Sequence, residues 1–348
     1  MTDPEISAMT QHPDDELSGI RVFTPETDVE DLDTAGNPEE PKPGLDEVEA
    51  ALLRGEYPRS MLVGLSDLSA SETRRFRQTW NAVDDSVREA VVSELNDLSE
   101  ERVDYLFGRV LRSVLDDPDP VVRRRAIVGL WEDTTPGLAD SMIAILRGDP
   151  SEDVRAEAAR ALARFAEQSE LGECDDELAE RVRATLLETM ENSGEPLHVR
   201  ARALEAASVF SANDRVRAAI EFFFEEDDTG FRATSLYAMG RSVNREFLPR
   251  ILNETASDDG EIRFEAARAA GRIGDTSALP VLADLATDED AEVRHAAINA
   301  LGEIGGKAAT RYLRRIAEGA VAADEELIDG ALEDAALVVD PLLLDDNN

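Results

Sequence analysis

The chain has 348 residues, of which 76 are Asp or Glu and 36 are Lys or Arg, giving a formal net charge of −40. Such a charge repels the phosphates of nucleic acids and of anionic lipids, so it argues against sequence-independent binding to either. The single cysteine, Cys174, cannot form an internal disulfide, and no apolar run approaches the roughly 18 residues that span a bilayer. The start at Met1 lacks the basic and apolar regions of a signal peptide, so we expect a cytoplasmic protein.

Residues 1–44 carry 12 acidic and 2 basic side chains, with six prolines and little apolar periodicity. Because so little apolar surface is available to offset the entropy of ordering, we expect an acidic disordered tail. Residues 45–68 predict a helix from Leu45 to Arg54, ended by Gly55 and Pro58, and then an apolar segment that leads into the main array. Residues 341–348 are expected to be a short acidic C-terminal tail.

Residues 69–340 repeat. Seven segments share an aliphatic or aromatic residue, then an arginine, then a stripe of Ala and Leu. The arginines are Arg88, Arg123, Arg155, Arg200, Arg232, Arg263 and Arg294, at spacings of 35, 32, 45, 32, 31 and 31 residues. The interval of 45 indicates an insertion, which we place at the polar stretch near 168–177. An eighth segment, 324–338, has Ile328 where the arginine would stand, as expected of an atypical terminal repeat.

One repeat shows how each unit is built. Val293, Ala297, Ala300 and Leu301 fall on one helical face, Asp290 can cap the start of that helix, and glycines end it. A shorter apolar stripe over 279–287 precedes this helix. Each repeat is therefore predicted to hold a helix A, a turn and a helix B.

The repeated arginine lies in the first turn of helix B, where the helix dipole disfavours a cation. An acidic residue stands six positions before it in Asp117, Asp149, Glu226 and Asp288, and four before it in Asp84, Asp119, Asp228, Asp259 and Asp290. We therefore expect a ladder of arginine–carboxylate and arginine–carbonyl contacts between successive repeats.

The segments 117–123 (DPDPVVR), 288–294 (DEDAEVR) and 266–275 (AARAAGRIGD) resemble HEAT repeats in their short prokaryotic, phycobilisome-lyase-like form. The resemblance covers about 270 residues and implies an all-α fold, a right-handed α-solenoid of about seven to eight helix pairs. The stretches 63–69 and 129–133 resemble a prokaryotic HEAT protein type without a known activity. The acid-rich composition, with only the two lysines Lys42 and Lys307, resembles proteins of salt-loving archaea; charge that serves a specific basic partner is the alternative.

Catalytic patterns are absent from the sequence. Deoxyhypusine hydroxylases share this repeat type but hold iron through His-Glu pairs, whereas His12, His198 and His295 are each followed by Pro, Val or Ala. No residue set identifies a bilin lyase, and there is no phosphate loop, nucleophile elbow or zinc-type Cys/His cluster. We therefore expect no cofactor, no metal and no enzymatic activity.

The candidate site is one face of the array. When helix B is numbered from its leading aliphatic residue as zero, positions 3, 6 and 10 are predicted to point away from the core. In an acidic protein these positions are enriched in arginine, and the candidate partner-binding residues are Arg125, Arg160, Arg164, Arg202, Tyr237, Arg241, Arg268 and Arg272. They predict a groove for another protein, such as an acidic or extended segment; the alternative is that these arginines pair with Glu157, Glu265 and their neighbours.

The sequence has two further aromatic features, Trp131 and the phenylalanine run 222–224. Trp131 is expected to be partly buried against the next repeat, and at least one of the three phenylalanines at 222–224 is expected to point outward. The leading functional hypothesis is a non-catalytic interaction scaffold. An accessory subunit or lyase-like protein that handles a prosthetic group is the alternative, and nucleic-acid binding is disfavoured by the charge. The sequence does not specify the oligomeric state.

Overall fold

The computed structural model describes residues 42–319 and 324–338, so most of the predicted tail 1–44 and all of the predicted tail 341–348 lie outside the described residues. Within those ranges the chain forms α-helices and short 3-10 helices, without a strand. The helices are α1 Leu45–Arg54, η2 Arg59–Leu65, α2 Ala70–Trp80, α3 Asp85–Glu101, α4 Gly108–Ser113, α5 Pro120–Val128, α6 Pro136–Gly148, α7 Glu152–Ala161, α8 Ala163–Glu170, α9 Asp176–Glu191, α10 Leu197–Ala207, α11 Asp214–Phe224, α12 Thr229–Arg241, η3 Arg245–Phe247, α13 Leu248–Glu254, α14 Gly260–Ile273, η4 Thr276–Ala278, α15 Leu279–Leu285, α16 Ala291–Ile304, α17 Gly306–Ala317 and α18 Glu325–Leu337.

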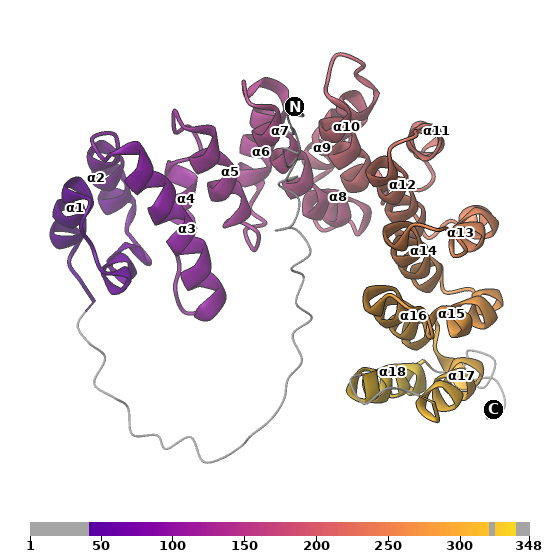
Figure 1. The fold of residues 1–348 in the computed structure, drawn as a ribbon. Helices are drawn as coiled ribbons and strands as arrows, with labels where there is room; N and C mark the ends of the chain where they lie inside the picture. The colour runs from indigo at the N-terminus through magenta and orange to yellow at the C-terminus, as the bar shows by residue number, and fades with distance from the viewer. Residues whose placement is uncertain (1–41, 320–323, 339–348) are drawn as a thin grey trace, which may run out of the picture. The chain divides into compact units, whose positions relative to one another are not determined.

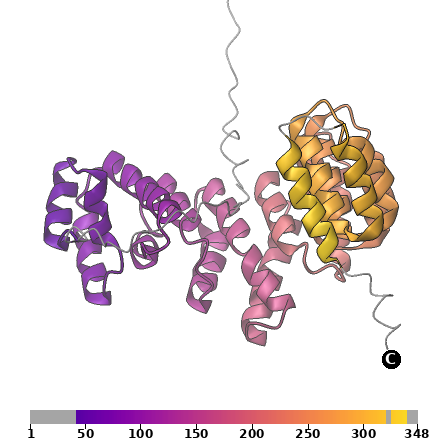
Figure 2. The same cartoon turned by 90° about the horizontal axis from the view of Figure 1, so that it is seen from below.

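From α2 onward the helices follow one another as pairs, which Figure 1 shows along the chain. Helix A of each pair is α2, α4, α6, α9, α11, α13, α15 or α17, and helix B is α3, α5, α7, α10, α12, α14, α16 or α18. The helices B contact one another in succession from α3 to α18, and the helices of the last pairs stand in two layers (Figure 2). The predicted all-α solenoid of HEAT-like helix pairs is confirmed.

The core lies between the two layers, on the stripe that the sequence indicated. In α16, Val293, Ala297, Ala300 and Leu301 are each at most 1% exposed. The starts of helices α3, α5, α12, α14 and α16 are capped by side chains; Asp290, for example, accepts a hydrogen bond from the backbone N–H of Glu292 at 2.9 Å. Burial of this Ala-rich stripe against both neighbours is what makes each pair depend on the next.

Glycines let the last helices B approach each other closely. Gly240, Gly271 and Gly302 occupy the same place in α12, α14 and α16, spaced by 31 residues. A Cβ atom added to Gly240 would lie 2.6 Å from the Cα of Ala269, and one added to Gly271 would lie 2.7 Å from the Cβ of Ala300. Backbones therefore pack directly on one another here, and a side chain at these positions would push adjacent repeats apart.

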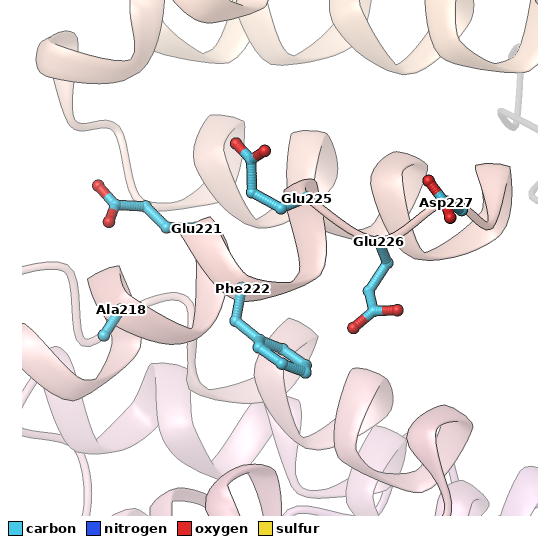
Figure 3. Close-up of a pocket in the computed structure, with 6 residues that line it drawn as sticks. All are labelled: Ala218, Glu221, Phe222, Glu225, Glu226 and Asp227. Carbon is cyan, nitrogen blue, oxygen red and sulfur yellow. The ribbon is translucent and has the colours of Figure 1, made fainter.

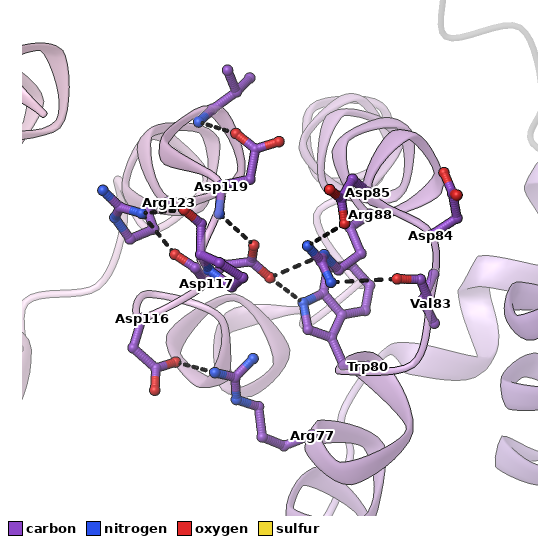
Figure 4. A network of polar contacts seen from close by, with 12 residues as sticks. Arg77, Trp80, Val83, Asp84, Asp85, Arg88, Asp116, Asp117, Asp119 and Arg123 are labelled. Carbon is purple, nitrogen blue, oxygen red and sulfur yellow. Dashed lines mark hydrogen bonds and ion pairs between the residues drawn. The ribbon is translucent and has the colours of Figure 1, made fainter.

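The repeated arginines join successive pairs (Figure 4). Arg123 Nη1 donates to the carbonyl oxygen of Asp117 at 2.7 Å. Its Nε and Nη2 donate to both carboxylate oxygens of Asp149 at 2.8 and 2.7 Å. One pair earlier, Arg88 Nε lies 3.3 Å from the carboxylate of Asp117, which also accepts from the indole N–H of Trp80 at 2.7 Å. Arg88 and Arg123 thus each contact the loop before their own helix and a carboxylate of the next pair.

The same arrangement recurs along the array. The inter-repeat carboxylate contacts are Arg155–Glu195 at 3.0 Å, Arg232–Glu254 at 2.7 Å, Arg263–Asp288 at 2.8 Å and Arg294–Asp324 at 3.3 Å. The acids that stand four residues before the arginines serve instead as helix N-caps: Asp84, Asp119, Asp228, Asp259 and Asp290. The two acidic positions of the repeat therefore have different structural roles.

Arg200 interrupts the carboxylate ladder. Its Nε donates to the carbonyl oxygen of Met190 at 2.9 Å, and its guanidinium lies over the rings of Phe222 and Phe223, 5.0 and 5.7 Å from their centroids. Within the described residues no carboxylate takes the place that Asp149 has beside Arg123, and Glu226 lines a hollow instead. Cation–π contacts replace the ion pair at this step.

The extra residues between Arg155 and Arg200 are largely helical. Helix α8 continues helix B after Leu162, and α9 is a helix A of 16 residues, so only residues 171–175 connect them. The polar stretch near 168–177 is therefore not a single inserted loop, because both of its ends belong to amphipathic helices whose apolar residues are buried.

Candidate interaction surface

The helix-B face is defined as the side chains at positions 3, 6 and 10 of helices α5, α7–α8, α10, α12, α14 and α16. The structure places the eight candidate residues on this series of contacting helices. Arg125 lies on α5, Arg160 on α7, Arg164 on α8 and Arg202 on α10. Tyr237 and Arg241 lie on α12, and Arg268 and Arg272 lie on α14.

Exposure at positions 3 and 6 varies along the array. At position 3, the side chains of Arg125 and Arg202 are 35% and 38% exposed, as predicted, whereas those of Glu157 and Glu265 are only 12% and 15% exposed. At position 6, the exposed fraction falls from 47% for Arg160 to 30% for Arg268 and 16% for Glu205. The arginines of this face therefore reach solvent, while the acidic side chains beside them are largely covered.

Several arginines of the face pair with carboxylates one helical turn away. Arg160 Nε donates to Glu157 at 2.6 Å, Arg202 Nη1 to Glu205 at 2.8 Å, and Arg268 Nη1 to Glu265 at 2.8 Å. Arg125 reaches back to Glu89 of α3 at 3.4 Å. Local pairing, which the sequence left open as the alternative to a binding groove, therefore occurs at these positions.

Tyr237 is the centre of a more specific arrangement, which we call the Tyr237 cluster: Tyr237, Arg241, Phe264, Arg268 and Arg272. Arg241 Nη1 donates to the Tyr237 hydroxyl at 3.1 Å, and the guanidinium of Arg272 lies 4.8 Å from the centroid of the same ring. Arg268 lies 5.3 Å from the centroid of the Phe264 ring. A guanidinium stacked on a ring keeps the N–H donors at its edge available for a carboxylate or carbonyl.

The Tyr237 cluster extends to helix α8. Arg241 Nη2 donates to Glu167, which stands on α8, so the extra helix of the third repeat contacts α12 directly. Separately, Thr234 Oγ1 of α12 donates to Glu205 of α10 at 3.2 Å. Helix α12 therefore has polar side-chain contacts with α8 and α10, and its Tyr237 ring contacts Arg272 of α14.

Two carboxyl groups beside the cluster have unusual protonation behaviour. Burial raises the pKa of Glu265 above its ordinary value, against the opposing effect of Arg268 and Arg272. Burial likewise raises the pKa of Glu303, and Arg272 and Arg268 again oppose it. Glu265, whose side chain is only 15% exposed, therefore lies in a partly desolvated region in which an arginine–carboxylate contact is stronger than it would be in water.

Trp131 is an exposed aromatic residue, so the prediction of partial burial is wrong. Its exposed fraction is 61%, because α5 ends at Val128 and Trp131 follows in a turn instead of facing the next helix B. Arg164 Nη1 donates to the Trp131 carbonyl oxygen at 3.0 Å. Burial lowers the pKa of Arg164, with Asp133 opposing and Arg160 adding to that effect.

The three adjacent phenylalanines of α11 behave as predicted, since one of them points outward. Phe223 is buried, whereas Phe222 is 45% exposed and lines a hollow of about 470 Å³ together with Ala218 and the acidic residues Glu221, Glu225, Glu226 and Asp227 (Figure 3). This hollow belongs to helix A and the following turn, so it is separate from the helix-B face.

The sequence-based prediction did not include the basic side chains of α17. Lys307, Arg311, Arg314 and Arg315 are all exposed on this helix A. The signal was present in the composition, because residues 306–317 contain four basic residues and no acid in a chain of net charge −40.

Residues 42–319 and 324–338 contain no group of three or more His, Cys, Asp or Glu side chains arranged to hold a metal ion. His295 Nε2 lies 2.9 Å from Asp324 at the last ladder contact, and His12 lies outside the described residues. In the same part of the chain, every helix is too short or too polar to cross a membrane.

Comparison with known proteins agrees with this architecture. The family model described as HEAT repeats matches residues 108–191 and 247–326. No curated protein matches the sequence. Among solved structures, the chain is similar to the CpcE–CpcF complex of phycocyanin lyase from Nostoc sp. PCC7120, with 16% identity and a TM-score of 0.46 over 66% of this chain and 95% of that chain.

Two further structures show the same kind of likeness. Human deoxyhypusine hydroxylase has 18% identity and a TM-score of 0.30, over 84% of this chain and 96% of that chain. Kap95p, in a structure with RanGDP, has 15% identity and a TM-score of 0.43, over 84% of this chain and 51% of that chain. None of these likenesses extends to function. The chain therefore contains HEAT repeats at residues 108–191 and 247–326, within an all-α solenoid of helix pairs.

Proposed function

We propose that the protein is a non-catalytic interaction scaffold that binds a protein partner through its helix-B face. The observation that carries the proposal is the Tyr237 cluster, in which two guanidiniums contact one tyrosine from two successive helices. Arginine and tyrosine are the residue types that contribute most to binding at protein interfaces, because each combines a large apolar surface with directional donors. An array of stacked helices also offers an extended surface of the kind that repeat proteins use for binding.

The paired arginines favour a partner that presents carboxylate or carbonyl oxygens in a defined geometry. Arg268 and Arg272 are held by Glu265, Phe264 and Tyr237, so little side-chain entropy remains to be lost on binding. A guanidinium has five N–H donors, and its bond to one carboxylate leaves donors for a second acceptor. An acidic or extended segment of another protein fits this chemistry better than a rigid polyanion, since the surrounding charge is negative.

Quantitative co-purification from native cell extract tests the proposal. The variant R268Q/R272Q removes two charges while it keeps amide donors for the local contacts, and R54Q/R74Q removes two charges from exposed arginines of α1 and α2 as a matched control. We expect at least one protein to bind the unmodified chain and the control but to be lost from R268Q/R272Q. Retention of every bound protein by R268Q/R272Q would contradict the assignment to this face.

The same preparation tests the rival function. A protein that handles a prosthetic group would carry a chromophore, visible as absorbance above the aromatic band, whereas a scaffold is expected to be colourless. A bound chromophore would replace the scaffold assignment with that of an accessory or lyase-like protein.

A further inference from the structure

Helix α17 contains four basic residues and no acidic one. Lys307, Arg311, Arg314 and Arg315 are spaced by four, three and one positions, so they share one face of the helix, and all four are exposed. We call this set the α17 stripe. It extends about 12 Å along the helix axis, given a rise of about 1.5 Å per residue.

Among the described residues, the cations of the α17 stripe lack the carboxylate partners that several arginines on other helices A have. Elsewhere on helix A, Arg147 pairs with Glu188, Arg181 with Asp140 and Arg215 with Glu191. Within residues 42–319 and 324–338, no carboxylate lies within ion-pair distance of any of the four stripe residues, although acids outnumber bases about twofold in the whole chain. Four such cations on one helix face are therefore a local departure from the charge pattern of this protein.

Helix capping accounts for only part of the stripe. Arg314 and Arg315 lie in the last turn of α17, where the negative end of the helix dipole stabilises a cation. Lys307 lies in the first turn, where the same dipole disfavours it, and Arg311 lies near the middle. Lys307 is also one of only two lysines in the chain. Stabilisation of the helix thus leaves half of the stripe unexplained.

The neighbouring contacts favour recognition of carboxylates. Arg315 lies over the ring of Tyr312, 5.4 Å from its centroid, and Tyr312 is itself half-buried. This stacking fixes the plane of the guanidinium and leaves its edge for a bidentate contact to a carboxylate. Acidic residues follow closely, with Glu318 after the helix and Glu325 and Glu326 at the start of α18.

We propose that the α17 stripe is a second interaction site, which binds an acidic polypeptide segment of a partner protein. Charge complementarity selects an acidic ligand. The short length of the stripe and its acidic surroundings select a flexible chain, which can place its carboxylates on four cations and keep the rest of its charge away. A nucleic-acid duplex or an anionic membrane would bring a continuous field of phosphates against the net charge of −40. This site lies on helix A and does not depend on the helix-B face.

Binding of a fluorescent oligo-glutamate peptide to the full-length protein tests the proposal, with fluorescence anisotropy as the measurement. The variant R311E/R314E reverses two stripe charges, and R54E/R74E makes the same charge change at exposed arginines of α1 and α2. We expect R311E/R314E to weaken peptide binding about tenfold and the control to weaken it less than about twofold. Circular dichroism confirms that both variants keep their helix content.

Zero-length carbodiimide coupling locates the peptide independently, because it joins amines to carboxylates and Lys42 and Lys307 are the only lysines. We expect the peptide to couple to Lys307 in the unmodified protein and in R54E/R74E, and to lose this coupling in R311E/R314E. The proposal is overturned by equal peptide affinity in all three proteins, by coupling to Lys42 alone, or by tighter stripe-dependent binding of a single-stranded oligonucleotide or of phosphatidylserine vesicles. Loss of binding in R268Q/R272Q but not in R311E/R314E would instead place the peptide on the helix-B face.

Discussion

The ladder contact between Arg263 and Asp288 makes a quantitative prediction about what holds adjacent repeats together. Arg263 donates from Nε and Nη2 to both carboxylate oxygens at 2.8 and 2.9 Å, and from Nη1 to the Ser257 carbonyl oxygen at 2.9 Å. The two side chains are only 13% and 11% exposed. Loss of one partner of a well-buried ion pair costs about 3–5 kcal/mol, and the remaining exposure lowers this to about 2–3 kcal/mol for R263A.

A double-mutant cycle isolates the contact itself. With R263A, D288A and the double variant, urea unfolding followed by circular dichroism should give a coupling energy of about 1.5–2 kcal/mol. The control cycle is Arg147–Glu188, which also joins two helices at 3.0 Å but has side chains that are 53% and 64% exposed, so its coupling should stay below about 1 kcal/mol. A coupling energy for Arg263–Asp288 no larger than that of the control would refute the role assigned to the ladder.

The pH dependence of the same contact follows from the direction in which it shifts the pKa of Asp288. The bond from Arg263 holds the pKa of Asp288 below its ordinary value of 3.8. A carboxylate with a lowered pKa adds stability above the pKa of the unfolded chain, and this stability is lost as the pH falls through the folded pKa. The difference in the free energy of unfolding between the unmodified protein and R263A should therefore be largest near neutral pH and should shrink below about pH 4. A difference that stays constant through this acid range would contradict the assignment.

Three further predictions concern single positions. Trp80 is 1% exposed and Trp131 is 61% exposed, so W80A should lower the free energy of unfolding by about 3–5 kcal/mol and W131A by less than about 1 kcal/mol in urea unfolding. Acrylamide should quench mainly the fluorescence that W131A removes. Equal losses of stability would refute this assignment of burial. G271A should lower the free energy of unfolding by about 1–3 kcal/mol, because the added Cβ meets the next helix. G330A in α18 has open space at its Cβ and should raise the free energy of unfolding by up to about 1 kcal/mol. Thermal unfolding checks both, and unchanged stability of G271A would contradict the close packing. Burial first, and Asp175 and Asp176 next, raise the pKa of Cys174, so its alkylation by iodoacetamide at neutral pH should be slower than that of free cysteine and should accelerate at alkaline pH; fast labelling at neutral pH would be inconsistent with this environment.

The periodic features of the fold were predictable because they are local. The aliphatic–arginine pair recurs in each helix B, and the Ala-rich stripe after Val293 is buried as the helical period requires. The carboxylate partner of each repeated arginine was harder to predict from the sequence. Asp117 and Asp119 both precede Arg123, and only the stacking of one pair on the next shows that Asp117 bonds Arg88 while Asp119 caps α5.

The errors have tertiary causes. Trp131 was assigned to a continuing helix B, but α5 ends at Val128 with Gly129 as its C-cap; glycines at 240, 271 and 302 lie inside helices B, so a glycine alone does not identify the end. Position 3 was expected to be open throughout, but Glu157 and Glu265 are largely covered while Arg125 and Arg202 reach solvent, a difference that the position within one helix does not predict. The contact between Arg241 and Glu167 joins residues 74 positions apart, which no repeat period predicts. The α17 stripe is a feature of the composition of residues 306–317, and it lies on a helix A, outside the helix-B positions from which the candidate site was predicted.

Hydroxyl-radical footprinting of the protein with and without its co-purified partner tests the central claim most directly, because it reports the exposure of individual aromatic side chains. Tyr237 and Phe264 lie on the proposed binding face, and exposed Phe222 in the hollow beside α11 is an internal control. The helix-B assignment predicts that the partner protects Tyr237 and Phe264 from oxidation and leaves Phe222 unchanged. Protection of Phe222 with unchanged oxidation of Tyr237 and Phe264 would contradict it.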